Sequence, residues 1–285
     1  MAIQVEITRK EVLKVISEFK KNYNYDFENY AELSFKRRIE YLLVSHNLTG
    51  IEELLAKTSA DETYFRKCIN DITVNTTELF RDPDVWQNLK QSVFNNLKDK
   101  RRINIWHAGC SSGEEVYSTL IMLNELNMLD KSNVIGTDIN TDILQKANDG
   151  IFNKRFNPCY FENFDKVMNG VAKNNGSIPH ILYSKYFELD EVTKLYRVKK
   201  FLREKVKFKY HNLVDGAAFC KFDLIFCRNV IIYFNTELQS KVVSLFHESL
   251  FNQGMLLVGV HENISYLPVG SKFESKIMKG LYVKK

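Results

Sequence analysis

The segment HAGCSSGEEVYS, residues 107–118, places small residues directly before a helix-like stretch, an arrangement that can hold a ligand against the chain. Gly109 and Gly113 allow the backbone to turn tightly and to approach a bound molecule. The N-terminus of the following helix would offer unpaired N–H groups and a partial positive charge. Glu114 and Glu115 occupy its first turn, however, and two carboxylates there would repel a phosphate group.

These two charges favour a cationic or neutral ligand at the glycine turn. S-adenosylmethionine, which carries a sulfonium and an ammonium group, suits them better than NAD does. The GxxxG spacing also differs from the GxGxxG fingerprint of dinucleotide sites. A plain strand-to-helix turn capped by an acidic residue would use the same residues, and it stays open as the alternative.

Asp138 is the next residue that fits a nucleoside site. It follows the predicted strand 133–137 and lies 25 residues after Gly113. In doubly wound sheets an acidic side chain at this place accepts hydrogen bonds from the ribose hydroxyls. The alternative is that Asp138 caps the predicted helix 141–149.

Three more polar residues follow predicted strands at their carboxyl ends. Asn212 comes after strand 206–210, where its amide could read an adenine edge. Arg228 and Asn229 come after strand 222–226. Ligands bind at this edge of open α/β sheets, although each of the three could instead be a turn-forming residue.

The elements that position these residues change in character along the chain. Residues 1–80 carry capping-box spacings at Thr8 with Glu11, Thr49 with Glu52 and Ser59 with Glu62. Apolar residues follow these caps at helical spacing, which predicts a small bundle of about four helices.

From about residue 103, short apolar strands alternate with helices, which predicts a mainly parallel sheet covered on both faces. The segments 273–277 and 281–284 look like a closing antiparallel hairpin. Residues 195–201 and the basic strand 205–210 are expected to pair as a second hairpin that projects from the sheet. The predicted strands are 103–107, 133–137, 206–210, 222–226 and 254–260.

The formal net charge is +5, and its distribution is uneven. Residues 1–80 hold 11 Lys/Arg and 13 Asp/Glu, whereas residues 192–210 hold 8 Lys/Arg and 1 Glu. A basic strip of this kind indicates an acidic partner, either nucleic acid, an anionic membrane surface or an acidic protein. Lys36, Arg37 and Arg38 form a second cationic turn, for which a solvated helix face is the simpler interpretation.

The cysteines indicate a reducing compartment, because their number is odd and no CxxC pair exists. His107 and Cys110 are close in sequence, but no second ligand pair has site-like spacing, so no metal is expected. No secretory signal is visible, and the apolar runs are far shorter than the roughly 20 residues that span a bilayer. We therefore expect a cytoplasmic protein without membrane insertion. The five cysteines lie at positions 68, 110, 159, 220 and 227.

Five segments follow one another along the chain: NTTELFRD (75–82), HAGCSSGEEVYS (107–118), GTDIN (136–140), FDLIFCRNVIIYF (222–234) and HENIS (261–265). In this order they resemble the family of chemotaxis receptor glutamate methyltransferases (CheR). The resemblance implies the α/β fold of class I S-adenosylmethionine-dependent methyltransferases, which has a Rossmann-like, mainly parallel sheet and a C-terminal antiparallel hairpin. It also implies a receptor-recognition helical domain at residues 1–80 and a catalytic domain at 81–285, which carries a β-subdomain around 185–206.

The resemblance further implies methyl transfer from S-adenosylmethionine to glutamate side chains on the cytoplasmic part of chemoreceptors, leaving S-adenosylhomocysteine. Tyr233 resembles the aromatic residue that lines the active site, and Lys36, Arg37 and Arg38 fall on the helix that faces the receptor. We also expect Gly109 to contact the cofactor, because it belongs to the glycine turn. The residues that match the family's cofactor-binding set are Asn75, Thr77, Arg81, Glu115, Asp138, Asn212, Leu213, Arg228 and Asn229.

The chemistry can also be argued from the acceptor. A glutamate carboxylate has a reference pKa of about 4.3, so it is ionised at pH 7 and needs no general base. Positioning should therefore dominate catalysis. The planar guanidinium of Arg81 could orient the acceptor carboxylate, that of the cofactor, or both. Tyr233 could donate a hydrogen bond or pack against the methyl group. Arg81 and Tyr233 are therefore the expected catalytic residues.

One segment departs from the family pattern. Members that bind a receptor C-terminal pentapeptide carry a glycine-rich loop in the β-subdomain, whereas residues 188–198, ELDEVTKLYRV, contain no glycine. We therefore expect a monomer that docks directly on receptor helices and does not use the pentapeptide.

Two competing functions stay open. A methyltransferase acting on nucleic acid would explain the basic strip, since phosphate contacts dominate such binding. Against it, no NPPY-like acceptor motif follows the strand 222–226, so nucleic acid is not the expected partner. A non-catalytic sensor or scaffold that binds S-adenosylmethionine is the other alternative.

Overall fold

The computed structural model describes residues 6–73, 77–153, 159–170 and 181–285. Its N-terminal part is a bundle of four helices with a hydrophobic core of its own. Thr8 and Glu11 form the expected capping box. The other two expected caps are wrong, because Thr49 bonds to Glu53, one residue further on, and Asp61 caps the fourth helix. The helices are α1 (Arg9–Tyr23), α2 (Glu32–Ser45), α3 (Ile51–Ala60) and α4 (Glu62–Ile72).

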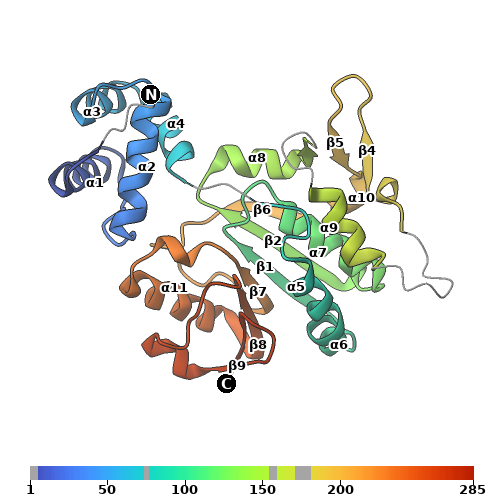
Figure 1. Ribbon diagram of the computed structural model, residues 1–285. Helices are drawn as coiled ribbons and strands as arrows, with labels where there is room; N and C mark the ends of the chain where they lie inside the picture. Colours follow the sequence, from blue (N-terminus) through green and yellow to red (C-terminus); the bar gives the residue numbers. More distant parts are fainter. Residues whose placement is uncertain (1–5, 74–76, 154–158, 171–180) are drawn as a thin grey trace.

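A seven-stranded sheet forms the centre of the remaining chain (Figure 1). The order is β6-β2-β1-β7-β8-β10-β9, and the first five strands are parallel. The expected closing hairpin is confirmed, since β10 runs antiparallel to β9 as well as to β8. The strands are β1 (Ile103–Ala108), β2 (Ser132–Asp138), β6 (Val206–Tyr210), β7 (Phe222–Cys227), β8 (Leu250–Val258), β9 (Phe273–Ser275) and β10 (Leu281–Lys284).

Helices cover both faces of this sheet (Figure 1). Side chains on both faces of β1 are apolar and need cover. Ile103 and Ile105 pack into one hydrophobic core, while Trp106 and Ala108 pack into the other. The first core includes α5 (Pro83–Asn88), η1 (Leu89–Val93), α6 (Phe94–Leu97) and α7 (Glu114–Glu125), and the second includes α11 (Thr236–Ser249). The other helical segments of the main sheet are α8 (Thr141–Asp149), η2 (Leu129–Lys131), η5 (Ile231–Tyr233) and η6 (Pro268–Lys272).

A second, three-stranded sheet lies beside the main one, in the order β3-β5-β4. The expected pairing of 195–201 with 205–210 is wrong. β5 pairs instead with β3 and β4, while β6 pairs in parallel with β2 at the edge of the main sheet. Register in these short strands is set by distant partners, which the local pattern does not encode. The elements are β3 (Ile151–Phe152), α9 (Cys159–Met168), η4 (Tyr183–Lys185), β4 (Phe187–Leu189), β5 (Tyr196–Val198) and α10 (Lys200–Arg203).

Polar contacts at two places join the helical bundle to the rest of the chain. Tyr30, between α1 and α2, forms an isolated antiparallel bridge with Phe234. Asn70 of α4 donates a hydrogen bond from Nδ2 to Asp142 Oδ2 of α8 at 2.7 Å. No helix in the described ranges is both long and apolar enough to cross a bilayer.

Candidate active site

A pocket opens at the carboxyl ends of β1, β2, β6 and β7, and the helical bundle supplies part of its wall. Tyr30, Ser34, Phe35 and Arg38 line it from the bundle. Ten of the predicted cofactor-binding and catalytic residues line the same pocket, whereas Asn75 lies outside the described residues. The ten are Thr77, Arg81, Gly109, Glu115, Asp138, Asn212, Leu213, Arg228, Asn229 and Tyr233.

The glycine turn after β1 packs closely against Val230, whereas its approach to a ligand stays a prediction. Gly109 has φ +72°, and a Cβ atom there would lie 2.6 Å from Cγ2 of Val230. The backbone N–H groups of Gly109 and Cys110 both donate to the carbonyl oxygen of Thr137, at 2.8 and 2.9 Å. The ends of β1 and β2 are therefore tied together at the pocket floor.

Asp138 lies at the end of β2 with its carboxylate held by backbone groups. Oδ2 accepts from the Ser111 N–H at 2.9 Å, and Oδ1 accepts from the Asn140 N–H at 3.0 Å. Burial raises its pKa. The alternative that Asp138 caps α8 is wrong, because the Asn140 side chain accepts from the first N–H groups of that helix. A carboxylate has about four acceptor positions, so Asp138 keeps capacity for a ligand.

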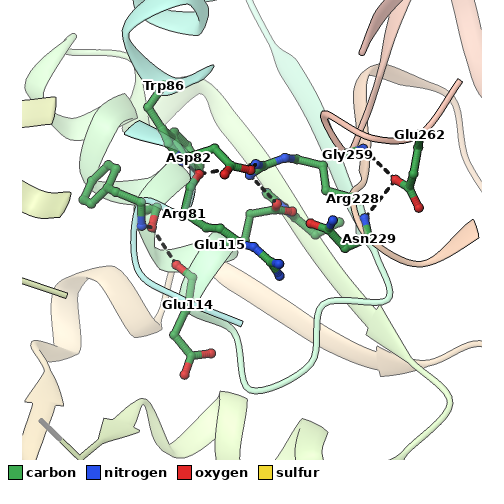
Figure 2. A network of polar contacts seen from close by, with 12 residues as sticks. Arg81, Asp82, Trp86, Glu114, Glu115, Arg228, Asn229, Gly259 and Glu262 are labelled. Carbon is green, nitrogen blue, oxygen red and sulfur yellow. Dashed lines mark hydrogen bonds and ion pairs between the residues drawn. The ribbon is translucent and has the colours of Figure 1, made fainter. Parts of the chain in front are cut away.

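Glu114 and Glu115 point in different directions, which corrects the expectation that both carboxylates act at the ligand (Figure 2). Glu114 is buried outside the pocket, where it accepts hydrogen bonds from Ser112 Oγ at 2.6 Å and Tyr160 Oη at 2.7 Å. Burial raises the pKa of Glu114. Successive residues of a helix are rotated by about 100°, so only Glu115 lines the pocket.

Glu115 is the centre of a buried polar network (Figure 2). Oε1 lies 2.9 Å from Nδ1 of His107, and Oε2 accepts from Nη1 of Arg228 at 3.1 Å. Arg228 also donates from Nη2 to Asp82 Oδ2 at 2.6 Å. Burial alone would raise the pKa of Glu115, but the His107 hydrogen bond and the Arg228 charge outweigh it and hold the pKa below its usual value.

The same network fixes the backbone of Arg81. Its carbonyl oxygen accepts from Nε1 of Trp86 at 3.0 Å and from Nη2 of Arg228 at 3.3 Å. Asp82 then turns the chain with φ +57°, and Pro83 begins α5. The hydrogen bonds found for the Arg228 side chain therefore go to protein groups that shape the pocket.

Glu262 organises the turn after β7, and the sequence interpretation gave it no role. Its Oε2 accepts from the N–H groups of Asn229 and Gly259 at 2.8 and 2.6 Å (Figure 2). Its Oε1 accepts from the N–H of Ile232 at 3.1 Å. Asn229 has φ +60°, a conformation that Asn tolerates better than most residues. The HENIS segment is the sequence signal that could have pointed to Glu262.

Asn212 follows β6 and forms a turn, as the alternative interpretation of its sequence position predicts. Oδ1 accepts from the Val214 N–H at 2.9 Å, and Nδ2 donates to Asp215 Oδ2 at 3.1 Å. An adenine contact by this amide stays a prediction. His211, which sequence reasoning missed, also lines the pocket, and burial lowers its pKa. A neutral imidazole therefore faces this end of the pocket.

The three residues of the cationic turn on α2 separate in the structure. Arg38 lines the pocket, donates from Nε to the Ile72 carbonyl at 3.0 Å and also donates to the Asp71 carbonyl. Lys36 pairs with Glu6 and Glu40 on another face, and Arg37 is exposed to solvent.

Tyr233 is half-buried where the two parts of the chain meet. Burial raises its pKa, while the charges of Arg38 and Arg81 act in the opposite direction. A positive charge lowers a phenol pKa only from nearby, so one cation from the helical bundle and one from the segment before α5 act on this hydroxyl.

Comparisons with known proteins identify the family of this chain. The model of the CheR methyltransferase S-adenosylmethionine-binding domain matches residues 75–157 and 169–277, and that of the family's all-alpha domain matches residues 10–73. The Cher3 methyltransferase of Pseudomonas putida is 32% identical over 264 residues, covering 93% of this chain and 92% of its own. The chemotaxis protein methyltransferase of Borreliella burgdorferi is 29% identical over 296 residues, which cover 99% of this chain and 96% of that protein.

A glycopeptide N-methyltransferase, MtfA, solved with sinefungin, gives a TM-score of 0.36 at 9% identity and covers 64% of this chain and 50% of its own. The family assignment does not depend on that distant likeness, because the two domain models account for most of the sequence. The chain is an S-adenosylmethionine-dependent methyltransferase and belongs to the CheR family.

Proposed function

We propose that this protein methylates glutamate side-chain carboxylates on cytoplasmic helices of chemoreceptors and leaves methyl esters. The observation that supports this most is that one pocket brings together two sets of side chains. Glu115 and Asp138 form the first set, and Arg38, Arg81 and Tyr233 form the second, in which both arginine charges act on the Tyr233 hydroxyl. The first set suits a cationic nucleoside, and the second suits an anionic acceptor. The names of relatives as chemotaxis protein methyltransferases agree with such an acceptor.

The first set fits S-adenosylmethionine. Glu115 would accept from the ammonium group and Asp138 from the ribose hydroxyls, and Gly109 lines the same pocket. Arg81 would pair with the cofactor carboxylate. When bound, this cofactor supplies an electrophilic methyl group on a positively charged sulfur.

The second set, Arg38, Arg81 and Tyr233, would bind and orient the acceptor. Because the acceptor carboxylate is ionised at neutral pH, none of these residues has to remove a proton. Arg81 and Arg38 would attract the carboxylate, and Tyr233 would fix one oxygen so that the other faces the methyl group. Positive and negative charge cancel during the transfer, so the apolar wall of Tyr30 and Phe234 would assist by excluding water.

The exposed face of α2 supports a helical partner. Leu33, Arg37, Tyr41 and Val44 follow one another at spacings of four, four and three residues and therefore share one face. Leu33, Tyr41 and Val44 are 72%, 55% and 46% exposed. An apolar stripe with a cation in it suits an amphipathic helix that carries acidic residues. We propose that residues 1–80 recognise the receptor here; the boundary at residue 80 stays a prediction.

Tethering by a receptor pentapeptide is not part of this proposal. The turn between β4 and β5 is closed by Asp190, whose Oδ1 accepts from the N–H groups of Val192 and Thr193 at 2.9 and 3.0 Å. Calorimetry with a receptor-tail peptide is expected to detect no binding, and micromolar affinity would contradict this part.

A radiolabelled methyl-transfer assay tests the function. Receptor cytoplasmic fragments, RNA and a reaction without acceptor are compared, and methanol released by base marks a carboxyl ester. Label is expected on the receptor fragment alone, and it should fall at least tenfold in Arg81→Ala and Tyr233→Phe. Label on RNA would favour the nucleic-acid alternative. Cofactor binding without any transfer would favour the sensor alternative.

A further inference from the structure

The loop between α1 and α2 is joined to the segment that carries Tyr233. The N–H of Ala31 donates to the carbonyl oxygen of Tyr233 at 2.8 Å, and the N–H of Asn235 donates to that of Asn29 at 2.9 Å. These two bonds flank the antiparallel bridge between Tyr30 and Phe234. The helical bundle therefore contributes backbone hydrogen bonds to the active-site turn.

Side chains strengthen the same junction. Nδ2 of Asn235 donates to Oδ1 of Asn29 at 3.1 Å. The rings of Tyr30 and Phe234 pack edge to face with centroids 5.3 Å apart, and Tyr30 packs in the same way on Phe27 at 4.8 Å. The bridge is thus anchored in the core of the bundle as well as in the catalytic sheet.

The neighbours of Tyr233 are held from within the catalytic part, whereas its own carbonyl is not. Nε2 of Gln239 donates to the carbonyls of Ile231 and Phe234 at 3.0 and 2.9 Å. Glu262 accepts from the Ile232 N–H. The carbonyl of Tyr233 instead receives the Ala31 N–H. The N–H of Tyr233 donates to the Val230 carbonyl at 3.2 Å, so it is the carbonyl end of this residue whose position depends on the helical bundle.

We propose that the segment Asn29–Ala31 is a positioning element for Tyr233, so that the helical bundle completes the acceptor side of the active site besides docking a partner. This inference rests on the proposed role of Tyr233. Ala31 is also the N-cap residue of α2. The helix proposed to meet the receptor and the carbonyl of Tyr233 are therefore connected through a single residue.

Ala31→Pro tests the proposal at one atom. Ala31 has φ −61°, close to the −65° that proline requires, and its side chain makes no capping hydrogen bond. Tyr30 has the extended pairing that a residue before proline prefers. The substitution therefore fits the backbone, removes the N–H and places Cδ against the Tyr233 carbonyl. Ala31→Ser is the matched control, because it keeps the N–H.

We expect kcat of Ala31→Pro to fall at least tenfold, because one lost hydrogen bond can account for about tenfold and the Tyr233 carbonyl must also move away from Cδ. The affinity for S-adenosylhomocysteine should stay within about twofold of the wild type. Ala31→Ser should match the wild type in both. Asn235→Ser gives a second perturbation, because serine still caps α11 but is too short to reach Asn29. It should lower kcat about threefold, again without loss of cofactor affinity.

A double-mutant cycle separates positioning from general destabilisation. In a Tyr233→Phe background, Ala31→Pro should slow kcat little further, because both changes remove the same contribution. Wild-type kcat in Ala31→Pro, or an equal loss in both backgrounds, would overturn the inference. A wild-type rate in Tyr233→Phe alone would instead remove the proposed catalytic role of Tyr233.

Discussion

His107 provides a sharp test of how the cofactor end of the pocket works. Its ring is fully buried and stacks on Phe226 with centroids 4.3 Å apart. Nδ1 faces Glu115, while Nε2 is buried and finds no hydrogen-bond partner within the described residues. A proton on Nδ1 satisfies this geometry best, because Nδ1 then donates to Glu115. His107 does not line the pocket, so it acts on a ligand only through Glu115.

Replacing His107 by leucine or by asparagine separates the hydrogen bond from the shape. The two replacements have the same branched outline, but only asparagine offers an N–H where Nδ1 lies. A hydrogen bond to a charged group contributes about 1.5–3 kcal/mol, which corresponds to about 10- to 150-fold in a dissociation constant. We therefore expect His107→Leu to weaken S-adenosylhomocysteine binding at least tenfold and His107→Asn to weaken it less than about threefold.

The pH dependence follows from the lowered pKa of Glu115. The ammonium group needs an ionised carboxylate, so affinity is present at neutral pH and is lost as the pH falls through the Glu115 pKa. Leucine removes the hydrogen bond that lowers this pKa. The loss of affinity should consequently begin at higher pH in His107→Leu than in the wild type.

Titration calorimetry with two ligands makes the test specific. Methylthioadenosine shares the nucleoside of S-adenosylhomocysteine but lacks the ammonium and carboxylate groups. His107→Leu should leave the affinity for methylthioadenosine unchanged. An equal loss for both ligands, or an asparagine variant as weak as the leucine variant, would refute the reasoning.

Two further predictions concern stability, measured by urea unfolding. Gly109→Ala combines a left-handed φ with a 2.6 Å contact to Val230 and should lower the free energy of unfolding by about 2–4 kcal/mol. Gly50→Ala meets no atom within 4 Å and changes only the N-cap residue of α3, so it should lower the free energy of unfolding by less than about 1 kcal/mol. Glu114→Gln should raise the free energy of unfolding at pH 8 but not at pH 4. Because the native pKa of Glu114 lies above 4.5, the wild type loses stability as the pH rises above that value. The Glu114→Gln variant has no group to ionise there and keeps its stability.

The sequence predicts those elements whose signals are local. Helix α8 has its expected bounds, Thr141–Asp149, because Asn140 caps one end and Gly150, with φ +61°, ends the other. Strand β6 also has its expected bounds. The wrong pairing of β5 arose because its partners lie on β3 and β4, and short strands do not encode which neighbour they meet.

The candidate site could be predicted as a set of positions, because the carboxyl ends of parallel strands meet at one edge. The directions of its side chains could not. Arg228 reaches Asp82 across 146 positions of sequence, and Asn229 reaches Glu262 across 33. The divergence of Glu114 from Glu115 depends on which face of α7 meets the pocket. That is a tertiary property, and the sequence motif alone leaves it undetermined.

Charge counted along the sequence also differs from charge at the site. The basic strip at 192–210 is divided between the small sheet, α10 and β6, and three of its lysines pair with acids. None of its residues lines the pocket, whose cations come from α2, the segment before α5 and the end of β7. An acidic partner inferred from the strip would therefore bind on an outer surface and not in the pocket. The proposed preference for a carboxylate acceptor depends instead on Arg81 and on Arg38, the one member of the cationic turn on α2 that lines the pocket. These two residues meet because the helical bundle packs over the sheet.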